Sequence, residues 1–523
     1  MRNILLASVA TLATGGLTGA AWAQAPAAPA APVGAPSQGQ VAYPAAPAPV
    51  SYVNSNNNYQ ASALPGPLAN PTPGTIVIHI NGKVQVDISG AWTSADTVFH
   101  TAPAAGTTAA LLGNNGTGVT KLQPQAIDSF ARLYFGADGM ATNGLRYGAA
   151  IELRQNFIGE QSGSSASTYT SAQTMFVRRA FTYVAGDQWG IVRAGEADGL
   201  IGIFDNGVTT FQFLPTGNFN GGDSQSVMPG GVAPTWVWMS QAGGEYGNAK
   251  LVYISPQIAG FDFGLQYAPN TSNGFGNSSP SDGGLSGSLI GSGNGTGVVC
   301  SVSTTGCPSL SAGPGSLDGS RIINQYAAGI RYQGSFNGLG VLAYAVYEGS
   351  GNADYTGASA ATAAGRANLG ISGLPTSKYT GQYKGLSVGS GGIALTFAGL
   401  TVGANVIGGR KNGYVALQPV GAVHQLGVIG GVKYVAGPLT VGVALMDYWD
   451  QGNVQMTGLS QHHAYGINPG LSYSVAPGYT VYAEYLWNEQ RQSGVNQLTG
   501  ATGSSANNAI KGQAILVGNV VNF

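Results

Sequence analysis

The sequence predicts an all-β protein, a transmembrane antiparallel β-barrel of about sixteen strands. Three observations indicate this fold class. Apolar residues recur at every second position, which is the period of a strand and not of a helix. Short turns alternate with long loops throughout residues 75–523. Only 8% of the 523 residues are charged, against about 25% in ordinary globular proteins, so a soluble protein of this size is disfavoured.

Residues 1–23 have the features of a secretory signal peptide. The stretch starts with the positive charge of Arg2, continues through an apolar core around Val9, and ends with small residues at Ala23. This pattern predicts cleavage before Gln24. A membrane anchor is the alternative, but the apolar part is short and is interrupted by glycines.

Residues 24–74 form an Ala/Pro-rich segment that cannot build a core. Closely spaced prolines keep such a chain extended and stiff. We expect a disordered periplasmic segment. A tether that reaches peptidoglycan or a periplasmic partner is the functional alternative.

Residues 75–523 alternate between apolar and polar side chains, and the strands from 75 and around 130–157 show this best. In a membrane barrel the apolar face contacts lipid and the polar face lines a lumen, whereas in a soluble sandwich the apolar face packs inward. The apolar positions of these strands are Ile78, Ile80, Val84, Val86, Ile88, Trp92, Ala131, Leu133, Phe135, Leu145, Tyr147, Ala149, Ile151, Leu153 and Phe157.

The lengths of the connections decide between these two folds. Seven short turns and eight long loops imply sixteen strands, with both ends of the chain on the short-turn side. This is the asymmetry of an outer-membrane barrel with short periplasmic turns and long external loops. No apolar run of 18 residues follows residue 24, so a membrane crossing requires closed strands. The predicted short turns are 137–143, 185–188, 255–259, 334–337, 398–399, 436–438 and 476–478.

The last predicted strand, 512–523, ends on the aromatic residue Phe523. Its outward face carries Ile515, Val517 and Val521, with Asn519 as an exception. Aromatic residues near strand ends would suit the girdles at the two membrane interfaces. They are Trp92, Tyr253, Tyr267, Tyr434, Trp449, Tyr473 and Trp487.

Several local runs resemble the general Gram-negative porin family, whose members are trimeric diffusion channels of sixteen strands. They are 131–136 (ARLYFG), 143–145 (NGL), 178–181 (RRAF) and 255–267, together with the terminal Phe523. The resemblance covers about 75–523 and is best in the first half. It implies that Phe523 is the signal read by the barrel-assembly machinery.

The resemblance also implies a basic cluster on the barrel wall, opposite acidic residues of a third loop that folds into the lumen. Lys83, Arg132 and Arg178 match the wall positions, and all three fall on the polar face by alternation alone. Alternation places Arg179 on the apolar face, where it could pair at a subunit interface. Further basic wall candidates are Arg146, Arg154 and Arg193.

The loop after Glu196 holds more apolar surface than an external loop should expose, including Ile203 and Phe204. We expect burial inside the barrel, with Asp198, Asp205 and Glu196 as the acidic partners of the basic wall. The Pro-Glu-Phe-Gly-Gly run that the family usually has in this loop is absent.

Other signals suggest no reaction and no cofactor. Cys300 and Cys307 are expected to form a small disulfide in a long loop. The pair His462 and His463 has no third ligand at metal spacing. No serine and histidine pair has the arrangement of a hydrolase, so no catalytic residue is expected. The formal net charge of −1 offers no footprint for nucleic acid.

The expected function is passive diffusion of small hydrophilic solutes and ions through a water-filled pore in the Gram-negative outer membrane. The expected partners are outer-membrane lipid and lipopolysaccharide, two further copies of the chain in a homotrimer, and the assembly machinery. Two alternatives stay open: a solute-selective porin for sugars or anions, and a structural envelope anchor.

Overall fold

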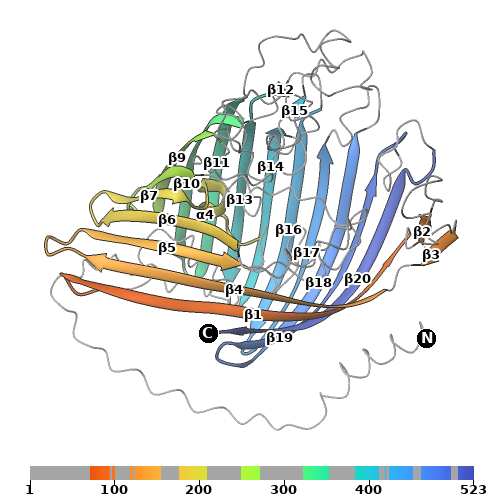
Figure 1. Cartoon of the computed structure of the whole chain (residues 1–523), viewed down its shortest axis with the longest axis horizontal. Coiled ribbons are helices and arrows are strands. Elements are labelled where there is room, and N and C mark those ends of the chain that lie inside the picture. The colour runs from red at the N-terminus through yellow and green to blue at the C-terminus, as the bar shows by residue number, and fades with distance from the viewer. Residues whose placement is uncertain are drawn as a thin grey trace, which may run out of the picture. The chain divides into compact units, whose positions relative to one another are not determined.

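The computed structural model describes residues 71–94, 97–100, 118–121, 124–154, 176–208, 249–270, 322–352, 383–411, 418–419, 423–450, 461–495 and 505–523. Sixteen antiparallel strands close into one barrel, as the sequence predicts. Figure 1 shows β1 beside both β4 and β20, and these two pairings close the sheet. In order around the barrel, the strands are β1 (Thr75–Thr93), β4 (Gln125–Met140), β5 (Arg146–Arg154), β6 (Phe176–Gly186), β7 (Gly190–Glu196), β8 (Ala249–Ile254), β9 (Phe261–Asn270), β10 (Ile322–Phe336), β11 (Leu339–Asn352), β13 (Ser387–Phe397), β14 (Leu400–Arg410), β16 (Gln425–Ala436), β17 (Leu439–Asp450), β18 (His462–Ala476), β19 (Tyr479–Arg491) and β20 (Ala509–Asn522).

All seven predicted short turns join neighbouring strands of this barrel. The turn between β13 and β14 consists of Ala398 and Gly399, with φ values of 46° and 84°. Positive φ at both central residues is the geometry of a type I′ turn, whose twist matches that of the strands it joins. The short connections therefore fix the register of each hairpin, and the long loops leave from the other end of the barrel.

The two faces of each strand differ in exposure. On β9, Phe263, Leu265 and Tyr267 are 46–52% exposed, whereas Asp262 and Gln266 on the other face are 4–5% exposed. Large apolar side chains that point away from the interior would aggregate in water but are stable against lipid. We call the exposed apolar face outward and the other face inward.

The inward face is not uniformly polar. Most buried charged side chains lie on β1 to β11 and on the segment that follows β7. From β13 to β20 the inward positions include apolar residues such as Ile407, Ile429, Met446 and Leu516, all at most 5% exposed. Alternation identifies the outward face of strands such as β1 and β5, because lipid requires apolar residues there, but it does not predict how much of the inward face is apolar.

Some of the expected loops contain short elements. Strands β2 (Thr97–His100) and β3 (Gly118–Lys121) pair with each other, as do β12 (Tyr383–Lys384) and β15 (Gln418–Pro419). The helix α4 (Leu200–Phe204) follows β7, and no helix in the described part of the chain is long and apolar enough to cross a membrane. The predicted signal peptide, residues 24–70 and both cysteines lie outside the described residues.

Candidate functional site

Four buried side chains form a chain of alternating charge that runs across the neighbouring strands β4, β5 and β6 to the segment after β7. The Arg132 Nε lies 3.8 Å from Glu152 Oε1. Arg179 Nη1 lies 3.0 Å from Glu152 Oε2, and its Nη2 donates to Asp198 Oδ1 at 2.7 Å. No side chain of the four is more than 3% exposed. We call Arg132, Glu152, Arg179 and Asp198 the charge chain.

The alternation of sign explains how these charges remain stable without bulk water. Moving an isolated ion out of water costs several kcal/mol even after relaxation. Arg179 offsets this cost by donating to two carboxylates at once, through the fork of its guanidinium group. Removal of Arg179 would disturb both carboxylates, because its guanidinium group contacts Glu152 and Asp198.

The inward position of Arg179 corrects the assignment of this residue to the apolar face. The pairing of β5 with β6 shifts at this point, since Glu152 pairs with Arg179 and Leu153 pairs with Val177. Arg178 is therefore the extra residue of a β-bulge. Arg179 shares its face with Phe181, Tyr183 and Ala185, which are all at most 8% exposed. It points inward because the inward face of β6 is the apolar one, and the bulge changes the alternation only toward Val177.

The structure places Lys83 beside the charge chain. The backbone of Lys83 on β1 pairs directly with that of Arg132. Its ammonium donates to Gln85 Oε1 at 3.3 Å, and the Gln85 amide donates to Asp87 Oδ2 at 3.0 Å. All three β1 side chains are at most 5% exposed, so β1 extends the polar wall by one strand.

The other basic candidates do not gather at one place. Arg146 lies at the short-turn end of β5, with its Nη2 3.5 Å from Asp187. Arg193 points inward, is 2% exposed and has its guanidinium carbon 5.2 Å from the centre of the Phe181 ring. The strand positions of Arg154 and Arg178 are described, but their side chains are not.

The described start of the third loop, residues 197–208, is held by inward side chains of the next strands. The Lys250 ammonium on β8 donates to the carbonyl of Ala197 at 2.7 Å. Gln266 Oε1 on β9 accepts the backbone N–H of Leu200 at 2.8 Å, which is one of the helix N-terminal donors that α4 cannot pair internally. These contacts keep Asp198 next to Arg179.

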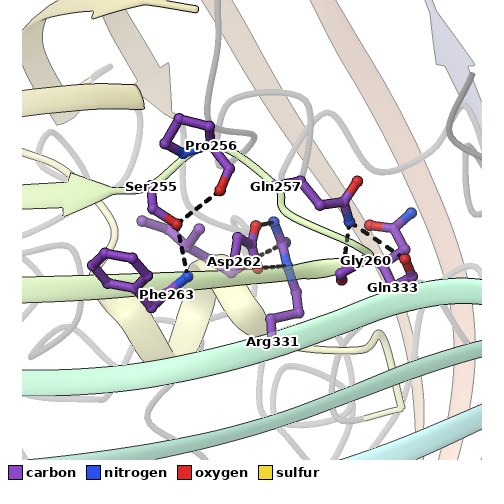
Figure 2. Close-up of polar contacts among 9 residues, drawn as sticks. Ser255, Pro256, Gln257, Gly260, Asp262, Phe263, Arg331 and Gln333 are labelled. Carbon is purple, nitrogen blue, oxygen red and sulfur yellow. Dashed lines mark hydrogen bonds and ion pairs between the residues drawn. The ribbon is translucent and has the colours of Figure 1, made fainter. Parts of the chain in front are cut away.

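Arg331 on β10 holds the other end of α4. Figure 2 shows its guanidinium against Asp262 of β9, and Nε donates to Oδ1 at 3.1 Å. Arg331 Nη1 also donates to the carbonyl of Ile203 at 3.2 Å, and the guanidinium carbon lies 4.9 Å from the centre of the Phe204 ring. One side chain therefore binds a strand, a helix carbonyl and an aromatic ring.

Beside this pair, Figure 2 shows the short turn between β8 and β9 bound to β10. The Gln257 amide donates to the carbonyls of Gly260 and Gln333 at 3.2 and 3.3 Å, and Ser255 Oγ accepts the N–H of Phe263 at 3.0 Å. The turn fixes β9 and β10 relative to each other. It thereby fixes the positions of Asp262 and Arg331, and Arg331 contacts α4.

Glycines on the inward face make room for the segment. A Cβ on Gly264 of β9 would lie 2.4 Å from Leu200 Cδ2, and one on Gly403 of β14 would lie 2.4 Å from Val208 Cγ2. Beyond α4, Asn206 donates to Asn405 Oδ1 at 2.6 Å, and Asp205 Oδ1 accepts the N–H of Gly207 at 3.1 Å. The segment thus contacts the inward face from β8 to β14.

Sequence reasoning named Asp198 and Asp205 but missed Glu152, Arg179 and Arg331 as site residues. Alternation places Glu152 on the polar face, so the sequence contains a signal for this residue. Arg179 was assigned to the wrong face because it shares a face with Phe181 and Tyr183, which point inward, and Arg331 requires the pairing of β9 with β10. Glu196 ends β7 half-buried, with its strand partner Ala180.

His462 and His463 lie on opposite faces of β18, and each faces an aspartate of β17. His462 Nδ1 lies 2.9 Å from Asp450 Oδ1, and His463 Nε2 lies 2.5 Å from Asp447 Oδ1. In the described part of the chain, no three His, Cys, Asp or Glu side chains form a group that could hold a metal ion.

The chain matches a family model and is similar, at low identity, to solved structures. A search of curated proteins finds no match. Similar solved structures include an anion-selective porin from Comamonas acidovorans (13% identity, 86% of this chain and 100% of that chain, TM-score 0.46) and OmpF from Salmonella typhi in complex with daunomycin (12%, 85% and 97%, TM-score 0.47). The family model described as Gram-negative porin matches residues 81–493. This chain therefore belongs to the Gram-negative porin family, whose place is the outer membrane.

Proposed function

We propose that the protein is a passive channel that lets small hydrophilic solutes and ions cross the outer membrane through a water-filled lumen. Residues 197–208 narrow this lumen beside the charge chain. Solutes move down their own gradients, and the chain carries out no reaction and needs no cofactor. Three copies assemble side by side, as the resemblance to trimeric porins implies.

The observation that carries the proposal is the bond between Arg179 on the wall and Asp198 on the segment after β7. A field that runs across a narrow pore orders water and favours polar solutes over apolar ones. Lys83, Arg132 and Arg193 add positive charge to the wall, and Asp205 adds negative charge to the segment.

Planar-bilayer recording tests this function. The expected result is step conductance that closes in three equal levels, with a reversal potential set by the balance of wall and segment charges. Conductance that saturates with one sugar or one anion would favour the solute-selective alternative. A folded barrel that gives no current would overturn the channel and leave the envelope anchor.

Three further proposals concern Phe523, the segment 24–74 and the two cysteines. Phe523 serves as the assembly signal, and in the structure its backbone N–H and carbonyl both bond to Gly82. The segment 24–74 acts as a periplasmic spacer after removal of residues 1–23. Cys300 and Cys307 form a loop disulfide, which alkylation with and without reduction would reveal as a mass difference.

A further inference from the structure

A tyrosine of β19 reaches over β20 and binds an aspartate of β1. Tyr482, Gly518 of β20 and Asp87 lie in one row of the sheet, because Gly518 is the direct cross-strand partner of both other residues. The Tyr482 hydroxyl donates to Asp87 Oδ1. This bond crosses the place where β1 meets β20 and the barrel closes.

The middle position of this row has room only for glycine. Neighbouring strands lie about 4.7–4.9 Å apart, so the tyrosine ring has to pass over the middle strand to reach the aspartate. A Cβ on Gly518 would collide with Asp87 Oδ1 and with the Tyr482 hydroxyl. The glycine therefore makes the contact between β19 and β1 possible.

The same arrangement occurs on the other side of β1. Gly148 of β5 is the direct partner of Asp138 on β4 and of Tyr183 on β6, and the Tyr183 hydroxyl donates to Asp138 Oδ1. A Cβ on Gly148 would lie 2.5 Å from Tyr183 Cε1. The second oxygen of Asp138 lies 3.0 Å from His79 Nε2 on β1. Two rows of the same composition thus end at inward side chains of one strand.

The contact of Tyr482 with Asp87 continues along β1 to a cation of the polar wall. Asp87 Oδ2 accepts from the Gln85 amide at 3.0 Å, and Gln85 Oε1 accepts from the Lys83 ammonium at 3.3 Å. All four side chains are at most 5% exposed, and hydrogen bonds are electrostatically stronger where water is excluded. The Asp87 carboxylate therefore has a donor on each oxygen, and Gln85 connects it to Lys83.

The Tyr482 hydroxyl affects how strongly Asp87 attracts Lys83. The two β1 residues share one face, and at about 3.3 Å per residue their Cα atoms are roughly 13 Å apart. A charge-assisted donor stabilises a buried carboxylate. Without the hydroxyl, Asp87 would attract the lysine ammonium more strongly, and the flexible stem of Lys83 allows it to follow. The positive charge would then move along β1, away from its place beside Arg132.

From these contacts we infer that Tyr482 is a positioning residue for ion selection: through Asp87 and Gln85 it holds the Lys83 ammonium on the polar wall beside Arg132. The inference rests on the proposed function, since only a conducting channel selects ions. It adds β19, a strand that carries no member of the charge chain, to the strands that determine which ions pass.

Zero-current potentials of the full-length protein in planar bilayers, under a KCl gradient, test the inference. Tyr482→Phe removes one hydroxyl and keeps the ring. The permeability ratio of K⁺ to Cl⁻ should rise about 1.5- to 2-fold, which is less than the roughly two- to fourfold rise expected when Lys83→Gln removes the whole charge. The matched control is Tyr485→Phe, which removes a hydroxyl from the outward face of the same strand, where it donates to Gln513 Oε1 at 3.0 Å. This control should leave the ratio unchanged.

A double-mutant cycle separates positioning from a general effect on the structure. If Tyr482 acts through Lys83, Tyr482→Phe should cause no further change of the permeability ratio in a Lys83→Gln background. Gln85→Met breaks the same path at its middle and is the second variant. It should reproduce the rise even if Tyr482→Phe does not fold, and heat-modified gel mobility reports folding of each variant.

Four results would overturn the inference while the wild type still conducts: an unchanged ratio in Tyr482→Phe or Gln85→Met, a shift toward Cl⁻ in either, an unchanged ratio in Lys83→Gln, or an additive effect of the two changes in the cycle. A folded wild type that gives no current would instead overturn the proposed channel. The two failures are therefore distinct.

Discussion

The Arg179 guanidinium group lies 2.7 Å from the Asp198 carboxylate, and both side chains are at most 2% exposed. This bond joins the wall strand β6 to the segment that follows β7. Glu152 holds the same guanidinium from the other side. This arginine therefore links the position of the segment to the charge of the wall, and several variants can test the link.

Replacement of Arg179 by Gln should destabilise the folded barrel by roughly 3–5 kcal/mol, because Asp198 would lose the cation it is bonded to and Glu152 would lose the nearer of its two arginines. Urea unfolding followed by tryptophan fluorescence measures the loss. The additional change Asp198→Asn should recover part of it. An Arg179→Gln protein as stable as the wild type would show that the carboxylates are solvated.

Replacement of Arg132 by Gln should shift ion selectivity toward cations. One charge near the path of an ion is worth ~1 kcal/mol at 4 Å in water, so the permeability ratio of K⁺ to Cl⁻ should rise about two- to fourfold. Zero-current potentials in a KCl gradient measure it. Lys511→Gln removes a cation from the outward face and is the matched control. Equal shifts of the zero-current potential in Arg132→Gln and Lys511→Gln would show that the charge chain does not determine ion selectivity.

Replacement of Phe204 by Ala should loosen α4. Its ring is fully buried under Arg331, and loss of a buried Phe costs roughly 3–5 kcal/mol. We expect noisier and larger single-channel currents. Phe263→Ala removes the same side chain from the outward face of β9, where it is 48% exposed, and should leave the currents unchanged. Identical recordings from the two variants would show that α4 does not influence the single-channel current.

Replacement of Gly403 by Val should displace Val208, since even a Cβ at residue 403 would lie 2.4 Å from Val208 Cγ2. Cysteine at position 208 should then react faster with a thiol reagent. The control is Gly389→Val, because a Cβ at Gly389 meets nothing within 4 Å. Equal labelling rates in both backgrounds would contradict the packing of the segment on β14.

Replacement of Phe523 by Ala should lower the amount of folded barrel in the outer membrane several-fold. The Phe523 ring packs against Gly82, where a Cβ would lie 2.8 Å from it, but the ring is 62% exposed, so the intrinsic stability should change little. Val521→Ala, on the same face of β20, is the control. Heat-modified mobility in gels distinguishes folded from unfolded protein. An equal yield of folded barrel from both variants would show that Phe523 is not an assembly signal.

The barrel itself could be predicted from the residues because lipid imposes a simple rule. Every second side chain of a crossing strand must be apolar, as at Ile78, Ile80 and Leu265, and a closed barrel must alternate short with long connections. Turn residues such as Ala398 and Gly399 are local signals that need no knowledge of other strands. Strand number, chain direction and the faces of strands such as β1 and β5 follow from these rules.

The site depends on contacts between residues that are far apart in the sequence. The apolar residues Phe181 and Tyr183 of β6 point inward together with Arg179, so the rule that apolar residues face lipid assigns Arg179 to the wrong face. Arg331 meets Ile203 only because β10 follows β9 around the barrel. A buried charge is stable only next to a partner of opposite charge. These partners come from different strands, so it is the closed sheet, and not the local sequence, that places them in contact.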